Sequence, residues 1–412
     1  MSRPRTTPLE RDDSPAAFMA AGVPGEGRKP RRHARVAAAA GTDEPRDAHA
    51  APAPPTPAAA ALERAAATTM RALRPPPRPK LDIRRARTYP LARRQSKVAA
   101  HEIGGRLEPG LSFAGWLERL PNILAAADLR FAAETIARAR LAGRGVALGM
   151  GAHPIKVGLS PLIVDLMERG VITSVALNGA GIIHDFELAV AGCTSEDVGS
   201  GLDRGRFGMA RETGAVLNRV IRDGAAAGLG LGEAVGRHVA GSRYPHRQLS
   251  ITAAGARLGV PVTVHVAIGT DIIHMHPSAD GAAIGAASMR DFHRLTEVVA
   301  GLARGVYVNL GSAVLLPEVF VKALNLARNL GHKVRPLVTV DLDFLRHYRP
   351  GVNVVSRPTA SGGRGVHITG HHELLFPLLA GAVLERIAAL SRSVKRSRST
   401  PAGARKRASR RR

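Results

Sequence analysis

Cysteine and aromatic residues are scarce in this chain of 412 residues. The single cysteine, Cys193, excludes an internal disulfide framework and a cysteine-rich zinc site, and it fits a reducing cytoplasm. Its context, Leu-Ala-Val-Ala-Gly-Cys, predicts a small buried side chain rather than a nucleophile. Aromatic residues make up only 3% of the chain, which argues against a surface that stacks on nucleic-acid bases.

Long apolar runs are also missing. We find no run of about 18 apolar residues, the length that a membrane-spanning helix needs. The N-terminal residues carry charges and prolines but not the hydrophobic segment of a signal peptide. We therefore expect a cytoplasmic protein without a membrane span.

Positive charge is abundant but unevenly distributed. The chain has 59 Lys and Arg against 33 Asp and Glu, a net charge of +26. Residues 1–100 hold 20 basic and 9 acidic side chains, residues 392–412 hold 10 basic and none acidic, and residues 101–391 hold 29 and 24. Because most of the excess lies at the two ends, we expect at most a weak attraction of these ends for polyanions.

The composition divides the chain into three parts. Residues 1–80 are rich in Ala, Pro, Arg and Gly and cannot bury enough apolar surface to fold, so we expect a disordered extension. Residues 81–390 are long enough for a sizeable core and should form one folded domain. Residues 391–412 should form a disordered basic tail.

Within the central part, short Val- and Ile-rich runs alternate with helical periodicity. The predicted strands are Gly145–Met150, Val171–Leu177, Pro261–Ile268, Gly305–Leu310 and Val334–Val340. The predicted helices are Ser112–Leu141 with an interruption at Pro121, Ser160–Arg169, Gly181–Ala191, Phe207–Ala226, Arg247–Leu258, Ser288–Leu302 and Pro317–Leu330. This alternation predicts an α/β fold, a Rossmann-like and mostly parallel sheet with helices on both faces.

Glycines and polar side chains gather in the segments that follow the strands. The polar residues are His153, Lys156, His184, Asp185, Asp271, His274, His276, Asp341 and Asp343. Ligands of open parallel sheets bind at this edge, and small residues let phosphates approach the backbone, so a dinucleotide is a reasonable ligand. No segment matches G-x-G-x-x-G or G-x-x-x-x-G-K-[ST], so the standard fingerprints do not support this prediction.

Three of these features have more than one interpretation. On extended backbone the side chains of His274 and His276 would point to the same side, and so would those of Asp341 and Asp343. These side chains could then bind zinc or iron. Otherwise the histidines form hydrogen bonds with a substrate or with the protein itself. Lys156 could contact a phosphate or substrate, form an imine, or be a solvated lysine. The glycine-rich segment 356–365, with Arg357 and Arg364, could close over a ligand or be a surface loop.

Four motifs in order resemble the deoxyhypusine synthase family, most of all its bacterial synthase-like branch. They are Gly151-Ala-His-Pro-Ile-Lys-Val-Gly-Leu-Ser160, Asn178-Gly-Ala-Gly-Ile-Ile-His-Asp-Phe-Glu-Leu-Ala189 with Thr194-Ser-Glu-Asp197, Gly269-Thr-Asp-Ile-Ile-His-Met-His-Pro277 and Glu373-Leu-Leu-Phe-Pro-Leu-Leu379. The resemblance covers about residues 95–390. It implies a Rossmann-like NAD-binding fold and a homotetramer with active sites at dimer interfaces.

The resemblance also implies a reaction. Family enzymes use NAD to oxidise spermidine, carry the aminobutyl group on a lysine as an imine, and deliver it to an acceptor amine, which is a protein lysine or a polyamine. Carried over by position, the residues that contact the cofactor are Ala152, His153, Asn178, Gly179, Ala180, His371 and His372. Those that contact the substrate are Asp271 and Gly311, to which the loop analysis adds His276, Arg357 and Arg364.

The departures from the family pattern bear on catalysis. The region that should hold the imine-forming lysine, residues 352–365, has neither lysine nor tryptophan. Pro317 or Glu318 stands where the family has an active-site histidine, and Ile183 and His184 replace two adjacent acidic residues. We therefore take Lys156, His184, Asp185 and Glu318 as the candidate catalytic residues.

Four functions remain open from the sequence. The first is an NAD-dependent transferase that acts on an amine, with covalent catalysis absent or moved to Lys156. The second is an NAD-dependent enzyme of different specificity, for example for a negatively charged substrate that Arg357 and Arg364 could hold. The third is a non-catalytic homologue that binds the nucleotide. The fourth is a metal-dependent hydrolase that uses His274, His276 and the two aspartates 341 and 343.

Overall fold

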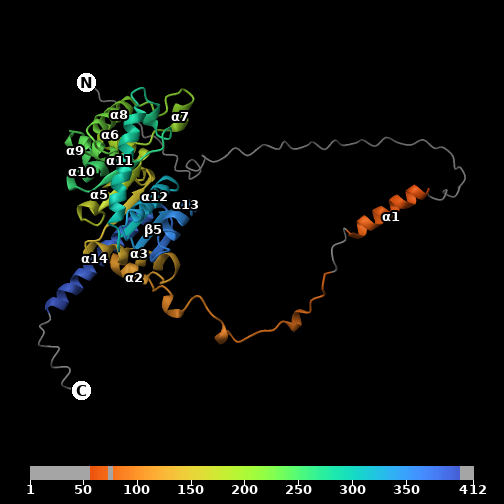
Figure 1. The fold of residues 1–412 in the computed structure, drawn as a ribbon. Coiled ribbons are helices and arrows are strands. Elements are labelled where there is room, and N and C mark those ends of the chain that lie inside the picture. Colours follow the sequence, from red (N-terminus) through yellow and green to blue (C-terminus); the bar gives the residue numbers. More distant parts are fainter. Residues whose placement is uncertain (1–55, 73–77, 400–412) are drawn as a thin grey trace, which may run out of the picture. The chain divides into compact units, whose positions relative to one another are not determined.

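The structure is a computed structural model that describes residues 56–72 and 78–399 (Figure 1). It distinguishes two compact units, Met1–Tyr89 and Pro90–Arg412. In the first unit the described residues form helix α1 (Pro57–Ala72) and the 3-10 turn η2 (Ile83–Arg85). Helix α1 lies within the predicted disordered extension, and its alanine-rich sequence explains it because alanine has the highest helix propensity. The rest of residues 1–77 and the end of the basic tail lie outside the described residues.

A six-stranded sheet lies at the centre of the second unit (Figure 1). Its strands are β1 (Val146–Met150), β2 (Ser174–Asn178), β3 (Val262–His265), β4 (Val306–Leu310), β5 (Leu337–Asp343) and β6 (Gly363–Thr369). All neighbouring strands pair in parallel, in the order β3-β2-β1-β4-β5-β6. The chain therefore starts in the middle, builds one half and then crosses to the other, which is the strand order of the Rossmann fold.

Helices connect the strands and cover both faces of the sheet. They are α2 (Phe113–Arg119), α3 (Leu124–Leu141), α4 (His153–Lys156), α5 (Ser160–Glu168), α6 (Gly179–Ala191), α7 (Val198–Leu202), α8 (Arg211–Ala226), α9 (Leu231–Gly241), α10 (Ile251–Leu258), α11 (Gly281–Ala300), α12 (Leu315–Asn329), α13 (Tyr348–Pro350) and α14 (His372–Ser399). Short turns complete the unit: η3 (Leu91–Arg93), η4 (Ala100–Glu102), η5 (Arg247–Leu249), η6 (Ile272–Met275) and the π-helical turn η7 (Gly351–Ser356).

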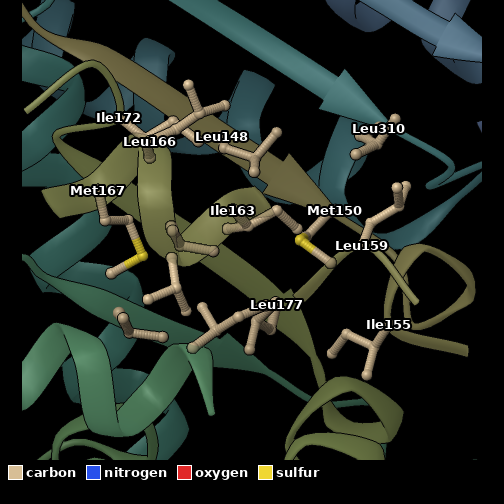
Figure 2. Close-up of a cluster of buried hydrophobic side chains, with 14 of the residues drawn as sticks. Leu148, Met150, Ile155, Leu159, Ile163, Leu166, Met167, Ile172, Leu177 and Leu310 are labelled. Atoms are coloured by element: carbon tan, nitrogen blue, oxygen red, sulfur yellow. The ribbon is translucent and has the colours of Figure 1, made fainter. Parts of the chain in front are cut away.

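Alternate strand residues pack into two separate layers of core. On one face Leu148 and Met150 of β1 lie against Ile163 of α5 (Figure 2). On the other face the ring of Tyr307 in β4 stacks on Phe320 of α12 with the centroids 3.7 Å apart. Because both faces are covered, β1 and β4 are buried along their whole length, and each fully buried Leu stabilises the fold by about 2–3 kcal/mol.

The predicted α/β fold with a parallel sheet is confirmed, and all five predicted strands are present. Strand β6 was not predicted because the glycines of Gly363-Arg-Gly are typical of a loop, whereas an edge strand tolerates such glycines. Helices α9 and α14 were not predicted either. Helix α14 contains Pro377, and a proline inside a segment usually indicates that a helix ends there. Strand β5 runs three residues further than predicted, to Asp343, which places Asp341 inside the sheet.

Two further expectations need correction. Cys193 is exposed, because α6 ends at Gly192 in a left-handed conformation and the cysteine lies beyond the helix. In the described part of the chain, one stretch, His372–Ser393 of α14, is long and apolar enough to cross a membrane by length and composition. Its residues Phe376, Leu379 and Val383 are buried in the hydrophobic core of the unit.

Candidate functional site at the carboxyl edge of the sheet

The strand order reverses between β1 and β4, the position at which open parallel sheets have their ligand-binding crevice, and we call this position the crevice. After β1 the chain continues toward β2, and after β4 it continues toward β5, so the segments that follow these neighbouring strands diverge. The two strand ends meet at glycines, because a Cβ on Gly151 would collide with the carbonyl oxygen of Gly311. Open parallel sheets bind their ligands at such a point, where the direction of the strand order reverses.

A chain of three polar side chains lies at this crevice. His153 begins α4 after β1, His372 begins α14 after β6, and Asp343 ends β5. The Nδ1 atoms of His153 and His372 are 2.8 Å apart, and His372 Nε2 is 3.5 Å from Asp343 Oδ1. His372 and Asp343 are buried, whereas His153 is half-exposed. The structure thus brings together His153 and His372, both predicted to contact a cofactor, but only His153 is accessible to a ligand.

Rigid neighbours fix the His372 ring. Gly311, at a φ of +63°, lies so close to it that a Cβ would be 2.6 Å from His372 Cε1. The ring of Phe344 meets that of His372 edge-on at 5.5 Å, and the backbone N–H of Phe344 donates to Asp343 Oδ1 at 2.8 Å. His371 is mostly exposed and lies nearly parallel to the Phe344 ring, so it can contact a ligand at the mouth of the crevice. Phe344 had no signal in the sequence beyond its place after a strand.

The ionisation of this group follows from its surroundings. Burial lowers the pKa of His153, and His372 and Lys156 act in the same direction, whereas Glu373 and Asp343 oppose them. Burial works against ionisation of Asp343, but the hydrogen bond and charge of His372 hold the pKa of Asp343 below its usual value. Asp343 is therefore a carboxylate at neutral pH, and His153 is a neutral imidazole.

Lys156 and His184 lie next to this group. Lys156 is exposed on α4, and its charge acts on both His153 and His184. Burial is the main cause that lowers the pKa of His184, while Glu187 raises it. His184 Nδ1 lies 2.7 Å from the hydroxyl of Thr194. The amino group of Lys156 is thus free to meet a ligand, whereas the Nδ1 of His184 is held within the protein.

A glutamate-lined cavity lies beside His184. Glu187 accepts hydrogen bonds from the hydroxyls of Thr194 and Thr213, at 2.5 and 3.0 Å. The cavity has a volume of about 500 Å³ and is also lined by Glu196 and Glu212. Glu187 and Thr194 lie within the second of the four sequence motifs, but no role was predicted for either residue.

The second predicted cofactor segment meets the predicted substrate residue Asp271. The carboxylate of Asp271 lies against Gly179 at the start of α6, and its buried Oδ2 has no hydrogen-bond partner in the described structure. Burial raises the pKa of Asp271, and the charge of His274 opposes this shift. Asn178 accepts the N–H of Gly181 at 3.0 Å. The first turn of α6 is thus already occupied by protein oxygen atoms, so it offers less to a phosphate than the sequence suggested.

A row of polar side chains crosses the sheet just below the crevice. The row consists of Asn309, Asp341 and His367, which are paired in register on β4, β5 and β6. Gly149 of β1 is the next residue in the same register but has no side chain. Asn309 donates to Asp341 Oδ1 at 2.7 Å, and His367 Nδ1 lies 2.5 Å from Asp341 Oδ2. Asp341 is thus held within the sheet, which removes it from the candidate ligand contacts.

Asp185, one of the predicted catalytic residues, is engaged in hydrogen bonds inside the fold. Its fully buried carboxylate accepts the hydroxyls of Ser250 and Thr252 and the backbone N–H groups of Ile251 and Thr252. These groups form the first turn of α10, so Asp185 fastens α6 to the start of α10. Burial raises its pKa, and the hydrogen bonds oppose the shift. Asp185 is on the side of α6 that faces the core.

Glu318, the fourth predicted catalytic residue, is also engaged elsewhere. It accepts a hydrogen bond from Asn353 at 2.8 Å and forms ion pairs with Lys322 and Arg349. The ion pair with Lys322, as the main cause, lowers its pKa. Glu318 therefore joins α12 to the turn η7, and no described contact connects it to His153 or Lys156.

The two arginines predicted to hold a substrate lie away from the crevice. Arg364 is near the amino end of β6, where it pairs with Asp128 at 2.6 Å and covers the ring of Phe131. Arg357 donates to Asn353 at 2.9 Å. The segment 356–365 does not close over a ligand, because its second half becomes edge strand next to β5.

The metal site is not supported either. The described residues contain no group of three or more His, Cys, Asp or Glu side chains that could hold a metal ion. His274 and His276 diverge because the backbone between them is a 3-10 turn rather than extended. His274 Nδ1 accepts the N–H of Gly269, whereas His276 packs against Gly214 and bonds to Ser278. The predicted pairing of these two histidines is therefore wrong.

The start of helix α5 suits a dinucleotide better than the start of α6. This helix follows β1 and the crevice, and no side chain caps its first turn. The hydroxyl of Ser160 in that turn is buried and has no hydrogen-bond partner in the described structure. Unpaired donors and the helix dipole at such a terminus favour a phosphate. The uncapped first turn of α5 and the buried Ser160 hydroxyl are therefore compatible with an anionic group near this helix start.

The comparisons with known proteins add a fold likeness. No protein-family model matches the chain, and no curated protein matches it. One similar solved structure is a candidate deoxyhypusine synthase from Entamoeba histolytica, with 12% identity, 68% of this chain and 96% of that chain covered, and a TM-score of 0.41.

Two other similar structures are longer proteins. The ternary complex of AgrE with ornithine and NAD+ has 18% identity, 65% of this chain and 34% of that chain covered, and a TM-score of 0.41. ArgZ, a cyanobacterial arginine dihydrolase, has 15% identity, coverages of 64% and 33%, and a TM-score of 0.40. This chain thus matches only a third of either protein. At these scores the likenesses do not bear on what this chain binds.

Proposed function

We propose that this chain is an NAD-dependent enzyme that oxidises an amine and transfers its aminoalkyl group to an acceptor amine. This is the reaction that the resemblance to deoxyhypusine synthases implies, with the aminobutyl group of spermidine as the group moved. The main observation in favour is the chain from His153 through His372 to Asp343 at the crevice between β1 and β4. Removing hydride from an amine carbon requires a neutral amine, and this group offers a base at the point where a dinucleotide should bind.

NAD would be held by residues along both sides of the crevice. Ala152 and His153 follow β1, the first turn of α5 carries the buried Ser160 hydroxyl, and His371 lies exposed at the mouth. When bound, NAD supplies an acceptor for the hydride. The protein supplies the orientation of the substrate and the exclusion of water.

The acidic side chains nearby suit an amine substrate. Asp343 and Glu373 act on His153, and Glu187, Glu196 and Glu212 line the neighbouring cavity of about 500 Å³. A polyamine in the crevice could place a distant ammonium group among these glutamates. This arrangement favours an amine over the negatively charged substrate that Arg357 and Arg364 would have held.

Lys156 is our candidate for the amine that carries the transferred group. It is exposed next to His153 and His184, and it takes the place of the lysine that residues 352–365 lack. A lysine amine attacks the oxidised substrate carbon and releases the remaining amine, which forms the imine. The side chain then has to deliver the group to the acceptor.

A second copy of the chain would cover the crevice. Large apolar side chains are exposed around it in the segments that follow the strands: Ile268, Met275, Val314, Leu345, Tyr348 and Leu374 are 51–74% exposed. A rim of this kind marks an interaction surface. We propose that it lies in a homo-oligomer, and Tyr348→Glu with Leu374→Glu should lower the molar mass measured by light scattering.

Two measurements test the function. The first identifies the small molecule that copurifies, where a nicotinamide dinucleotide is expected. The second incubates the protein with spermidine and NAD and measures released diaminopropane. Bound nucleotide without release would favour an enzyme of different specificity or a non-catalytic homologue; bound zinc or iron without nucleotide would contradict all NAD-dependent functions.

The role of Lys156 needs its own variant. Lys156→Arg keeps the charge but cannot form an imine, so it should abolish release of diaminopropane. Lys333→Arg changes an exposed lysine that precedes β5 and should leave release unaltered. If Lys156→Arg is as active as the Lys333→Arg control, the transferred group is not carried on Lys156.

A further inference from the structure

We propose that His153, His372 and Asp343 form a proton relay in which Nε2 of His153 is the base that faces the substrate. His372 and Asp343 are positioning residues that fix the tautomer of His153 and then hold the positive charge. This inference rests on the proposed function for its substrate, an amine, but its geometry and its first test are independent of any cofactor.

The hydrogen bond between the two histidines limits their protonation. The two Nδ1 atoms, 2.8 Å apart, share one hydrogen, so one ring donates and the other accepts. The carboxylate of Asp343 lies 3.5 Å from Nε2 of His372, which favours a proton on that nitrogen. The neutral His372 ring then accepts at Nδ1, and the donor is the Nδ1–H of His153.

It follows that Nε2 of His153 carries a lone pair. No described hydrogen bond engages this nitrogen, and His153 is the half-exposed member of the three. The charged or titratable groups that face His153 are His372 and Glu373 of α14, Asp343 of β5 and Lys156 of α4. Burial, as the main cause, lowers the pKa of His153 despite the two carboxylates, and His372 and Lys156 act in the same direction, so this nitrogen is free of a proton at neutral pH.

The surroundings keep the relay aligned. His372 cannot turn away, because Gly311 presses against one side of the ring and Phe344 packs on another. Asp343 is held by the N–H of Phe344, and its second oxygen lies 3.9 Å from His347 Nε2. The Phe344 ring also lies 5.8 Å from that of His153. One aromatic side chain thus contacts both imidazoles.

The proton movement balances as follows. Nε2 of His153 takes one proton from the substrate ammonium, which leaves a neutral amine. NAD+, when bound, would supply the acceptor for the hydride of the C–H bond next to the nitrogen, and the nitrogen lone pair would form the C=N bond. The Nδ1 proton of His153 moves to Nδ1 of His372. His153 is then neutral, with its hydrogen on Nε2, and His372 is an imidazolium beside the Asp343 carboxylate.

The first test uses heteronuclear NMR spectra of the imidazole rings in the full chain without added nucleotide. We expect His372 protonated at Nε2 and His153 at Nδ1 at neutral pH, with assignments from His153→Gln and His372→Gln. Asp343→Asn should change the His372 tautomer and, through it, that of His153. A resting His153 protonated at Nε2, or tautomers unaffected by Asp343→Asn, would overturn the relay whatever the activity.

The second test measures diaminopropane release from spermidine and NAD. His153→Gln should lower kcat by about 100-fold or more, the usual contribution of a general base. Asp343→Asn should lower kcat at least tenfold with little change in KM and move the acid limb of the pH profile to lower pH. Asp343→Glu, which retains the carboxylate, should restore part of the rate; an unchanged profile in Asp343→Asn would contradict the relay.

A matched histidine controls for structural effects. His238 of α9 is likewise partly buried, has a pKa lowered chiefly by burial, and is hydrogen-bonded at 3.0 Å to Tyr244. His238→Gln should leave the His153 tautomer and the rate unaltered. If the predicted tautomers are found but the wild type oxidises no amine, the proposed function fails while the relay is supported.

Discussion

The two ends of the parallel sheet differ in how their polar groups are satisfied. At the amino end, α9, α10 and α11 enclose a cavity of about 640 Å³ next to β3, and its charged side chains are paired: Arg237 with Glu233, and Arg294 with Glu297. The buried Asp291 there accepts the N–H groups of Gly232 and Val264 at 2.9 and 2.8 Å. At the carboxyl end lie the half-exposed imidazole of His153, the exposed Lys156 and the buried Ser160 hydroxyl, which has no hydrogen-bond partner in the described structure.

This difference shows that cavity size alone does not mark the site. The amino-end groups stabilise the fold: Asp291 satisfies an unpaired N–H of the edge strand β3 and the start of α9 at once. The carboxyl-end groups are held in position but keep unused hydrogen-bonding capacity. Side chains that are fixed and not satisfied are the ones available to a ligand.

The largest expected effect comes from a methyl group at the carboxyl end. Gly311→Ala should lower diaminopropane release by about 100-fold, because the new Cβ would displace the His372 ring from the relay. Gly143→Ala is the matched control: Gly143 has a φ of +64° against +63° for Gly311, but its Cβ would enter open space. Both should lose about 1–2 kcal/mol of stability in urea unfolding. Equal activity in the two variants would show that the His372 position is unimportant.

A second test concerns a carboxylate that we assign to the fold. Asp185→Ala leaves buried donors of the α10 turn without an acceptor and should lower the free energy of unfolding by about 3 kcal/mol. The kcat of the folded fraction should not change, which contrasts with Asp343→Asn. Asp165→Ala, at an exposed pair with Arg169, should change stability by less than about 1 kcal/mol. If Asp185→Ala lowered kcat strongly while stability stayed normal, Asp185 would be a catalytic residue.

The contrast between Asp185 and Asp343 also shows what the sequence could reveal. Periodicity located the strands and the polar residues after them, because apolar strands buried on both faces stand out. It could not say which way α6 turns its side chains. Asp185 and the neighbouring His184 differ by one position on a helix, which directs one to the core and the other to the edge.

The rest of the site depends on long-range contacts. His153 and His372 are 219 residues apart, and no spacing rule brings them together. His372 was found from the family resemblance, as a contact of the cofactor, but its burial and its bond to His153 required the structure. Asp343 had a signal, since it follows an apolar strand, yet the predicted strand ended three residues before it, and a metal site was only one of the interpretations of Asp341 and Asp343.

A smaller effect is expected from two buried groups near the edge strand β3, Asp291 and His265, which should change the stability of the fold with pH in opposite directions. Burial raises the pKa of Asp291 to about 7 and lowers that of His265 to about 4. Between pH 4 and 7 the folded state holds the Asp291 proton more tightly than the unfolded state does, so this group costs stability as pH rises. His265 has the opposite effect. Between about pH 6.5 and 4 the unfolded state binds a proton that the buried His265 does not, so stability falls as pH drops through this range.

These two slopes should nearly cancel in the wild type below pH 6.5. In urea unfolding at a series of pH values, Asp291→Asn should make stability rise more steeply with pH than in the wild type. His265→Gln should make it fall with rising pH. Each change should approach but not exceed about 1.4 kcal/mol per pH unit, the limit for one proton. Parallel curves for wild type and variants would show that neither group titrates between these values.

The smallest expected effect is at the large amino-end cavity. Arg294 and Glu297 form an exposed pair at 2.8 Å on its wall, and such pairs contribute at most about 1 kcal/mol. Arg294→Gln should therefore leave stability nearly unchanged, and diaminopropane release and nucleotide content should stay within about twofold. Arg237 pairs with Glu233 and Arg294 pairs with Glu297, so we expect that no ligand depends on the charge of Arg294. If instead Arg294→Gln abolished nucleotide binding while His153→Gln did not, the ligand would bind at the amino end, and the satisfied groups would be the functional ones.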